Sequence, residues 1–289
     1  MKPIKFHLLK AGHCSHPECV AMRGGRWSSL RFPALCGVIE HPERGVILFD
    51  TGYSSHFFDA TRPFPERAYR WVTPPTLAPE ETLVAQLARM GIAADAVRHI
   101  IISHYHGDHI AGLKDFPQAR FWSTRADYDA LRKRSRLGNL FHACLPALLP
   151  LDFMTRLDFA ENAKRMVLPR EFHPFDTGFD LLGDGSVAGI PLPGHSTGQM
   201  GLGFCRADGR HVFLVADACW TRSALDEDRR PTWIASRLFD SRHDYGATFS
   251  RLRELAAGKT GLAIVPSHCE QTWAAWPNES PNETPHEIR

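Results

Sequence analysis

The chain has 289 residues, 43% of them hydrophobic, and a formal net charge of +2 at pH 7. A chain of this length and apolar content buries a full core within one domain, expected here over residues 1–276. A charge near balance excludes any general electrostatic basis for binding nucleic acid or an acidic membrane surface, so we expect neither partner.

Cysteine usage and hydropathy indicate a cytoplasmic protein. Seven cysteines, an odd number, are scattered without the spacing of a disulfide framework, which favours reduced thiols. The N-terminus has no apolar run of signal-peptide length, and no run elsewhere is long enough to cross a bilayer. One cluster, residues 13–19, combines histidines and cysteines at short spacing. It fits either a small zinc clip or a polar loop.

The first half of the chain predicts a hairpin-rich sheet followed by a helix. Residues 36–40 and 45–49 read as strands around a proline-containing turn. Residues 53–78 are irregular and rich in aromatic side chains and prolines, so they predict a cleft wall or packing against the sheets. Residues 79–91 begin with Pro-Glu-Glu and end in glycine, as helices commonly do.

The strongest motif follows the β-branched run 97–102, which predicts a buried strand. Residues two apart on an extended chain share a face, so His104 and His106 can reach one ion together. Asp108 and His109 point elsewhere, and adjacent residues rarely bind one small ion alongside such a pair. The motif therefore predicts a metal site and indicates a second ion.

Three later apolar runs also end in candidate ligands, which are His195, Asp217 and His268. With the first motif they make seven nitrogen or oxygen donors, whereas one tetrahedral zinc takes about four. Two zinc ions therefore fit better than one. A donor set without thiolate also suits iron, manganese or cobalt.

Between these ligands, residues 125–170 carry apolar side chains at helical spacing and predict a helical insert. Its apolar face fits a cover over the metal edge that shapes a substrate pocket, packing within the core, or the interface of a homodimer. The sequence leaves these alternatives open. Residues 277–289 have little apolar content and predict a disordered tail.

With these ligands in this order, the sequence resembles the metallo-β-lactamase superfamily from Gly45 to His268. The resemblance implies a four-layer αβ/βα sandwich, in which two mixed sheets carry helices on both outer faces and metals lie at one edge. It also implies that Asp50, in an Asp-Thr-Gly turn after an early strand, orients a ligand histidine from outside the metal's own ligands. The implied ligand sets are His104, His106 and His195 on one metal, Asp108, His109 and His268 on the other, and Asp217 bridging both.

Within that family the chain is most similar to the lactonases that open N-acyl homoserine lactones. The ligand order, residues 124–131 and the loop 193–198 carry this similarity. Those lactonases place a tyrosine three residues after the bridging aspartate to hydrogen-bond the substrate carbonyl, whereas this chain has Trp220. An indole donates a hydrogen bond but cannot act as a phenol does. The candidates for this substrate contact are Trp220, His243 and Tyr245.

The expected function is a dinuclear metal-dependent hydrolase that opens a small-molecule lactone or ester. Water on zinc titrates at about pH 7, so a bridging hydroxide is available to attack a carbonyl carbon. Asp108 is the expected catalytic residue, which orients the hydroxide and passes a proton to the leaving alkoxide. Two alternatives remain open, a phosphodiesterase or nuclease and a metal-binding regulatory module without turnover. The near-neutral charge counts against a nuclease, and the complete ligand set counts against the module.

Overall fold

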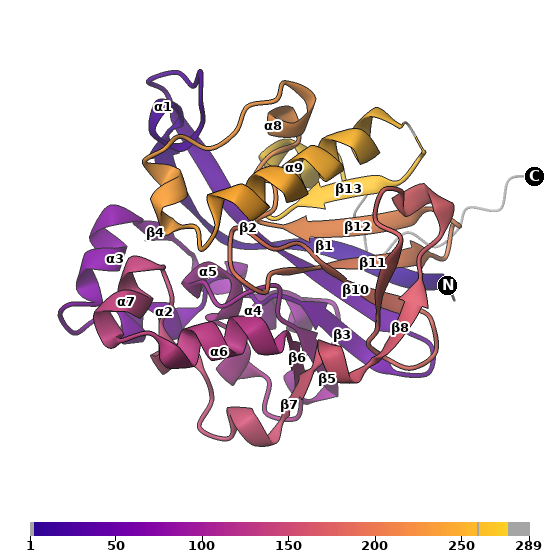
Figure 1. The fold of residues 1–289 in the computed structure, drawn as a ribbon. Helices are drawn as coiled ribbons and strands as arrows, with labels where there is room; N and C mark the ends of the chain where they lie inside the picture. The colour runs from indigo at the N-terminus through magenta and orange to yellow at the C-terminus, as the bar shows by residue number, and fades with distance from the viewer. Residues whose placement is uncertain (1–2, 259, 277–289) are drawn as a thin grey trace, which may run out of the picture.

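The computed structural model describes residues 3–258 and 260–276 (Figure 1). In this part of the chain thirteen strands form two sheets: ten of them follow one path of hydrogen-bonded neighbours, and the other three branch off this path. The sheets join where the first residues of β1 (Pro3–Pro17) pair in parallel with β11 (Met200–Arg206). Both sheets contain parallel and antiparallel pairs, which confirms the expected α/β class.

The first sheet brings the ends of several strands to one edge. Its other strands are β2 (Ser29–His41), β3 (Gly45–Phe49), β4 (Pro75–Thr76), β5 (Val97–Ile101), β6 (Arg120–Ser123) and β7 (Leu157–Phe159). β1, β2 and β3 are antiparallel neighbours, whereas β3, β5, β6 and β7 run parallel. Residues that follow β3 and β5 therefore emerge side by side.

The second sheet is built around β11. Its other strands are β8 (Lys164–Val167), β9 (Thr177–Asp180), β10 (Val187–Pro191), β12 (His211–Ala216) and β13 (Ala263–Pro266). β12 pairs in antiparallel with β11 and in parallel with β13, so the residues after β12 and β13 also emerge together.

The core lies between the two sheets and continues beneath the helices. Phe6 and Ile101 of the first sheet pack with Leu214 of the second in the inner cluster. Their neighbours Ile100 and Val215 point the other way, into the cluster that the helices cover. Successive side chains alternate between the faces of a strand, so a strand covered on both sides is apolar at consecutive positions.

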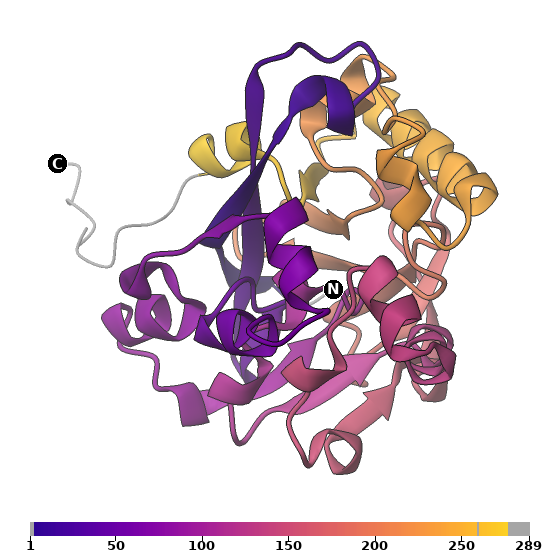
Figure 2. The same cartoon turned by 90° about the vertical axis from the view of Figure 1, so that its left-hand side faces the viewer.

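Helices cover the outer faces of both sheets, which completes the expected four-layer sandwich (Figures 1 and 2). The helices are α1 (Glu18–Ala21), α2 (Ser55–Ala60), α3 (Arg67–Val72), α4 (Leu83–Arg89), α5 (Gly107–Ile110), α6 (Arg125–Lys133), α7 (Arg136–Phe141), α8 (Arg222–Asp226), α9 (Arg242–Ala257) and α10 (Glu270–Ala274). Short 3₁₀ turns span Pro79–Glu81, Ala94–Ala96, Leu113–Asp115, Pro146–Leu148, Phe153–Thr155, Ala160–Asn162, Arg170–Phe172 and Ala235–Leu238. None of the described helices has the length and apolar content to span a bilayer.

Most predicted elements are found, with some differences. The strands at 36–40 and 45–49 lie within β2 and β3, and the predicted helix from residue 79 is a 3₁₀ turn followed by α4. Residues 53–78 contain α2 and α3, whose Phe57 and Tyr69 are buried, whereas Phe64 and Trp71 are exposed. Residues 13–19 are not a loop, because they form the end of β1 and the start of α1.

The insert at 125–170 is helical only in its first half. After α7 the chain makes 3₁₀ turns and then enters β7 and β8. Prolines at 146 and 150 interrupt the helical pattern, and β7 adds to the edge of the first sheet beside β6. The predicted disordered tail, 277–289, lies outside the described residues.

Candidate metal centre

The loop after β5 presents the first four candidate ligands at the sheet edge. His104 and His106 lie between β5 and α5, with His106 in extended conformation, and α5 then places Asp108 and His109 in a short helix that begins at Gly107. A β-carbon on Gly107 would lie 2.8 Å from Cε2 of Phe57, so glycine allows the ligand loop to pass close to α2.

The remaining ligands come from the second sheet. His195 lies in the loop after β10, Asp217 directly follows β12, and His268 follows β13 by two residues. Ala216, the residue before Asp217, has a φ of 48°, a left-handed conformation that is strained for alanine. Backbone strain of this kind is commonly held at functional sites, where surrounding structure stabilises it.

These seven side chains converge into two adjoining groups. In each group the potential ligand atoms lie within 4.8 Å of one another. The first group contains His104, His106, His195 and Asp217, and the second contains Asp108, His109 and His268. The family resemblance implied the same division of the other six side chains, with Asp217 shared by both sets. No group of three or more potential ligands in the described part of the chain includes the cluster 13–19.

Asp217 lies between the two groups. Its Oδ2 is 3.1 Å from Nε2 of His195, and its Oδ1 is 3.3 Å from Nε2 of His109 and 3.0 Å from Nε2 of His268. One carboxylate thus faces histidines of both groups, the geometry that a bridging ligand requires.

The centre also contains buried polar atoms that suit a bound cation. Nε2 of His104, Nε2 of His109 and Oδ1 of Asp217 have no hydrogen-bond partner among the described residues. Such atoms are costly to bury unless something satisfies them, and a divalent ion would satisfy all three. The residues present therefore fit the expected metal.

Hydrogen bonds from outside the cluster orient its histidines. Asp50 Oδ2 lies 2.8 Å from Nδ1 of His109 and accepts a 2.8 Å bond from the hydroxyl of Ser103, which lies 2.9 Å from Nδ1 of His104. Nδ1 of His268 lies 2.8 Å from the carbonyl oxygen of Pro33. Contacts at Nδ1 direct Nε2 toward the centre. Asp50 therefore contacts a candidate ligand histidine from outside the two groups.

The carboxylates of the centre attract positive charge, either protons on the histidines or a bound cation. Burial lowers the pKa of His104 and His106, which keeps these imidazoles neutral, the form that binds metal. Burial opposes protonation of His109 too, but the nearby carboxylates, with Asp108 the largest contributor, raise its pKa well above the usual value. Burial raises the pKa of Asp217, but the surrounding histidines outweigh it and hold this pKa well below the usual range.

The three candidates for the substrate contact lie in different surroundings. Trp220 lies beside the ligands, but its indole Nε1 donates to Oδ2 of Asp217 at 3.1 Å. Tyr245 is buried against Phe239, with ring centroids 4.5 Å apart. His243 was a wrong candidate, because its side chain is 95% exposed and pairs with Asp244. Arg242 begins α9, and this helical register turns His243 outward while Tyr245 points inward.

Two residues that the sequence analysis missed support His195. The ring of Phe239 packs on the His195 imidazole with centroids 4.7 Å apart. Asp240 accepts hydrogen bonds from both the backbone N–H and the hydroxyl of Thr197 at 2.7 Å. Both residues lie between α8 and α9, in a segment with no strand or helical periodicity that would have indicated them.

The insert packs into the core and also reaches the ligand loop. Tyr128 and Leu131 are buried core residues. The carbonyl of Ala143 accepts the N–H of Gly107 at 3.1 Å, and Cys144 forms an isolated bridge with His106. The insert therefore packs into the core and also lies next to the metal edge. The homodimer stays a prediction.

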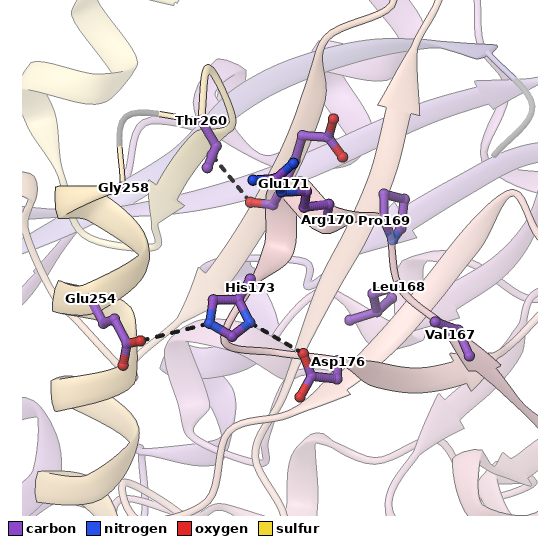
Figure 3. Close-up of a pocket in the computed structure, with 10 residues that line it drawn as sticks. All are labelled: Val167, Leu168, Pro169, Arg170, Glu171, His173, Asp176, Glu254, Gly258 and Thr260. Carbon is purple, nitrogen blue, oxygen red and sulfur yellow. Dashed lines mark hydrogen bonds and ion pairs between the residues drawn. The ribbon is translucent and has the colours of Figure 1, made fainter.

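A hollow of about 850 Å³ lies away from this centre, between the segment 167–176 and the end of α9 (Figure 3). Nδ1 of His173 is 3.4 Å from Asp176 Oδ1, and its Nε2 is 3.8 Å from Glu254 Oε1. All three side chains are more than half exposed, and exposed ion pairs contribute little binding or stability. None of the seven candidate ligands lines this hollow.

Comparisons with known proteins agree with this arrangement. The family model of the metallo-beta-lactamase superfamily matches residues 30–268. A probable metallo-hydrolase of Mycobacterium tuberculosis is 28% identical over 231 residues, covering 78% of this chain and 65% of that protein. The chain thus spans just under two thirds of that relative. The N-acyl homoserine lactonase AttM of Azorhizobium caulinodans is 25% identical over 282 residues, covering 96% and 97% of the two chains.

Solved structures show the same fold. A variant of AiiA from B. thuringiensis, with N-decanoyl-L-homoserine bound at its active site, superposes with a TM-score of 0.68 at 22% identity, covering 95% of this chain and 97% of that one. With the match over residues 30–268 and the observed sandwich, the chain belongs to the metallo-β-lactamase superfamily.

Proposed function

We propose that the protein is a hydrolase that opens lactones or esters with two metal ions, zinc by default, bound by the seven-residue centre. The observation that carries this proposal is the position of Asp217, within 3.3 Å of Nε2 of His109 and His195, one from each ligand group. Relatives named as N-acyl homoserine lactonases and a structural neighbour named as a dizinc lactonase support the same reading.

Two bound ions would lower the pKa of a shared water to about 7 and polarise a substrate carbonyl. Neutral His104 and His106 would bind one ion with His195, while Asp108, His109 and His268 would bind the other. Asp217 would belong to both sets.

Asp108 is the ligand best placed for proton transfer. Its side chain is 13% exposed, more than those of its neighbours His109 and His268, and its Oδ2 lies 3.6 Å from Nε2 of His268. A carboxylate that is in the centre and still reaches solvent in part can orient the attacking water and later carry a proton to the leaving alkoxide oxygen.

The test is a substrate panel on purified protein whose metal content is measured in parallel. The panel contains N-acyl homoserine lactones, simpler lactones, a thioester, a nitrophenyl ester and bis-nitrophenyl phosphate. We expect lactone or ester hydrolysis that disappears on metal removal and in Asp108→Asn. Turnover of the phosphodiester alone would favour the phosphodiesterase, and metal binding without turnover of any substrate would favour a regulatory module.

A further inference from the structure

Among the described residues Trp220 makes one polar contact, and that contact is with the carboxylate of Asp217. The indole Nε1 donates to Oδ2 of Asp217 at 3.1 Å. The ring is packed edge-on against Phe32 and Phe239, each with centroids 5.9 Å away, and against His195 at 6.2 Å. These contacts on several sides hold the indole in place, so its N–H points in a defined direction.

The N–H selects one oxygen of the carboxylate. Oδ2 is the oxygen that lies 3.1 Å from Nε2 of His195, whereas Oδ1 lies 3.3 Å from Nε2 of His109. Nε2 of His268 lies near both oxygens, 3.2 Å from Oδ2 and 3.0 Å from Oδ1. The last torsion of an aspartate side chain is broad and nearly two-fold, so the carboxylate needs an external contact to settle in one rotation. A donor on Oδ2 provides that contact and leaves a second lone pair of the oxygen for a metal.

We propose that Trp220 is a positioning residue that holds the Asp217 carboxylate in its bridging rotation and so strengthens metal binding, chiefly at the site of His104, His106 and His195. This inference rests on the proposed dinuclear centre. It assigns Trp220 a role different from the substrate contact expected from the sequence, since its single N–H is directed at Asp217. An indole N–H has no acceptor capacity and does not titrate, so the contact orients the carboxylate without carrying protons.

The test compares metal affinity in metal-free protein to which Zn²⁺ is added in competition with a chromogenic chelator. Trp220→Phe removes the N–H and keeps an aromatic ring in the cluster. Partners that orient metal ligands typically contribute 10- to 100-fold in affinity, so we expect one of the two binding steps to weaken at least about tenfold. The other step should change less.

Trp122→Phe is the matched control. It also removes a buried indole N–H, one with no hydrogen-bond partner among the described residues, from β6 rather than from the centre. Both binding steps should keep wild-type affinity in this variant. The inference would be overturned if Trp220→Phe kept wild-type affinity in both binding steps. It would also be overturned if Trp220→Phe and Trp122→Phe lost zinc affinity equally.

A measurement on the wild-type protein tests the same contact independently of whether the variant folds. In the indole ¹⁵N–¹H spectrum of zinc-loaded protein, the Trp220 N–H should exchange with solvent far more slowly than that of Trp27, whose side chain is 89% exposed. Equal exchange rates would count against the contact. If wild-type protein bound two ions and only the Trp220 results failed, the proposed function would stand. If it bound none, both proposals would fail.

Discussion

The carboxylate of Asp50 lies 2.8 Å from Nδ1 of His109, a contact that joins the residue after β3 to the ligand helix α5. Asp50 has a left-handed φ of 59° and also accepts the backbone N–H of Ser103 at 2.8 Å. Neighbouring parallel strands thus place the carboxylate beneath the ligands. The pairing of these strands therefore sets the orientation of the His109 side chain.

Asp50→Asn tests that link. Asparagine tolerates a left-handed φ and can still accept from Ser103, but its amide cannot stabilise His109 as a carboxylate does. We expect zinc affinity to fall about 10- to 100-fold in a chelator competition, with the fold retained in circular dichroism. Asp95→Asn, on an exposed turn away from the centre, is the control and should bind zinc like the wild type. Wild-type affinity in Asp50→Asn would contradict this role.

Asp108→Asn tests the proposed proton carrier. General acid–base catalysis commonly contributes 10²- to 10⁴-fold, so we expect kcat to fall by at least about a hundredfold. Because the side chain is partly exposed, the free energy of unfolding of the metal-free protein should change by less than about 1 kcal/mol. Kinetics at saturating zinc and urea unfolding measure the two effects. Unchanged kcat in the fully metal-loaded variant would reject the assignment.

Asp127, on α6, should make stability depend on pH. Burial raises its pKa from 3.8 to about 6, while the N–H of Gly198 donates to its Oδ1 at 3.3 Å. Between these pH values the folded state holds the proton more tightly than the unfolded chain, so the contribution of Asp127 to stability falls as pH rises from about 4 to about 6.

Asp127→Asn removes this dependence. The unfolding free energy of the variant minus that of the wild type should therefore increase by roughly 1 to 3 kcal/mol between pH 4 and pH 7. Urea unfolding of both proteins with EDTA present measures the difference. A difference that is constant or decreases over this range would contradict the prediction.

Gly194→Ala tests how closely the His195 loop lies against α9. Gly194 has a φ of 130°, and a β-carbon there would lie 2.0 Å from the backbone nitrogen of Tyr245. We expect a loss of at least about 3 kcal/mol in unfolding free energy. Gly209→Ala, at a φ of 81° with no atom within 4 Å, should cost only the backbone strain of about 1 to 2 kcal/mol. Equal losses would show that the loop and the helix can separate.

The sequence could indicate the candidate ligands because each combines a metal-binding side chain with a position at a strand end. His195, Asp217 and His268 each stand at or just after the end of an apolar run, and strand ends meet at one edge of a sandwich. The order of these candidate ligands along the chain then matched the order in the metallo-β-lactamase superfamily. The fold followed from the same resemblance, and the strands at β2 and β3 from local patterning.

What could not be predicted depends on contacts between distant segments. The direction of the Trp220 N–H depends on rings from β2 and from the segment before α9, and no local pattern encodes it. The outward turn of His243 depends on where α9 begins. The three-residue strand β7 is too short to produce a periodic signal, and it forms because β6 offers an open edge.

The most direct test of the central claim is a zinc titration of metal-free protein, with hydrolysis of an N-acyl homoserine lactone followed at each point. The account predicts that activity reaches its plateau at two equivalents of zinc per chain, and that elemental analysis of the saturated protein finds two ions. A plateau at one equivalent with a single bound ion would contradict the dinuclear centre that Asp217 is proposed to bridge.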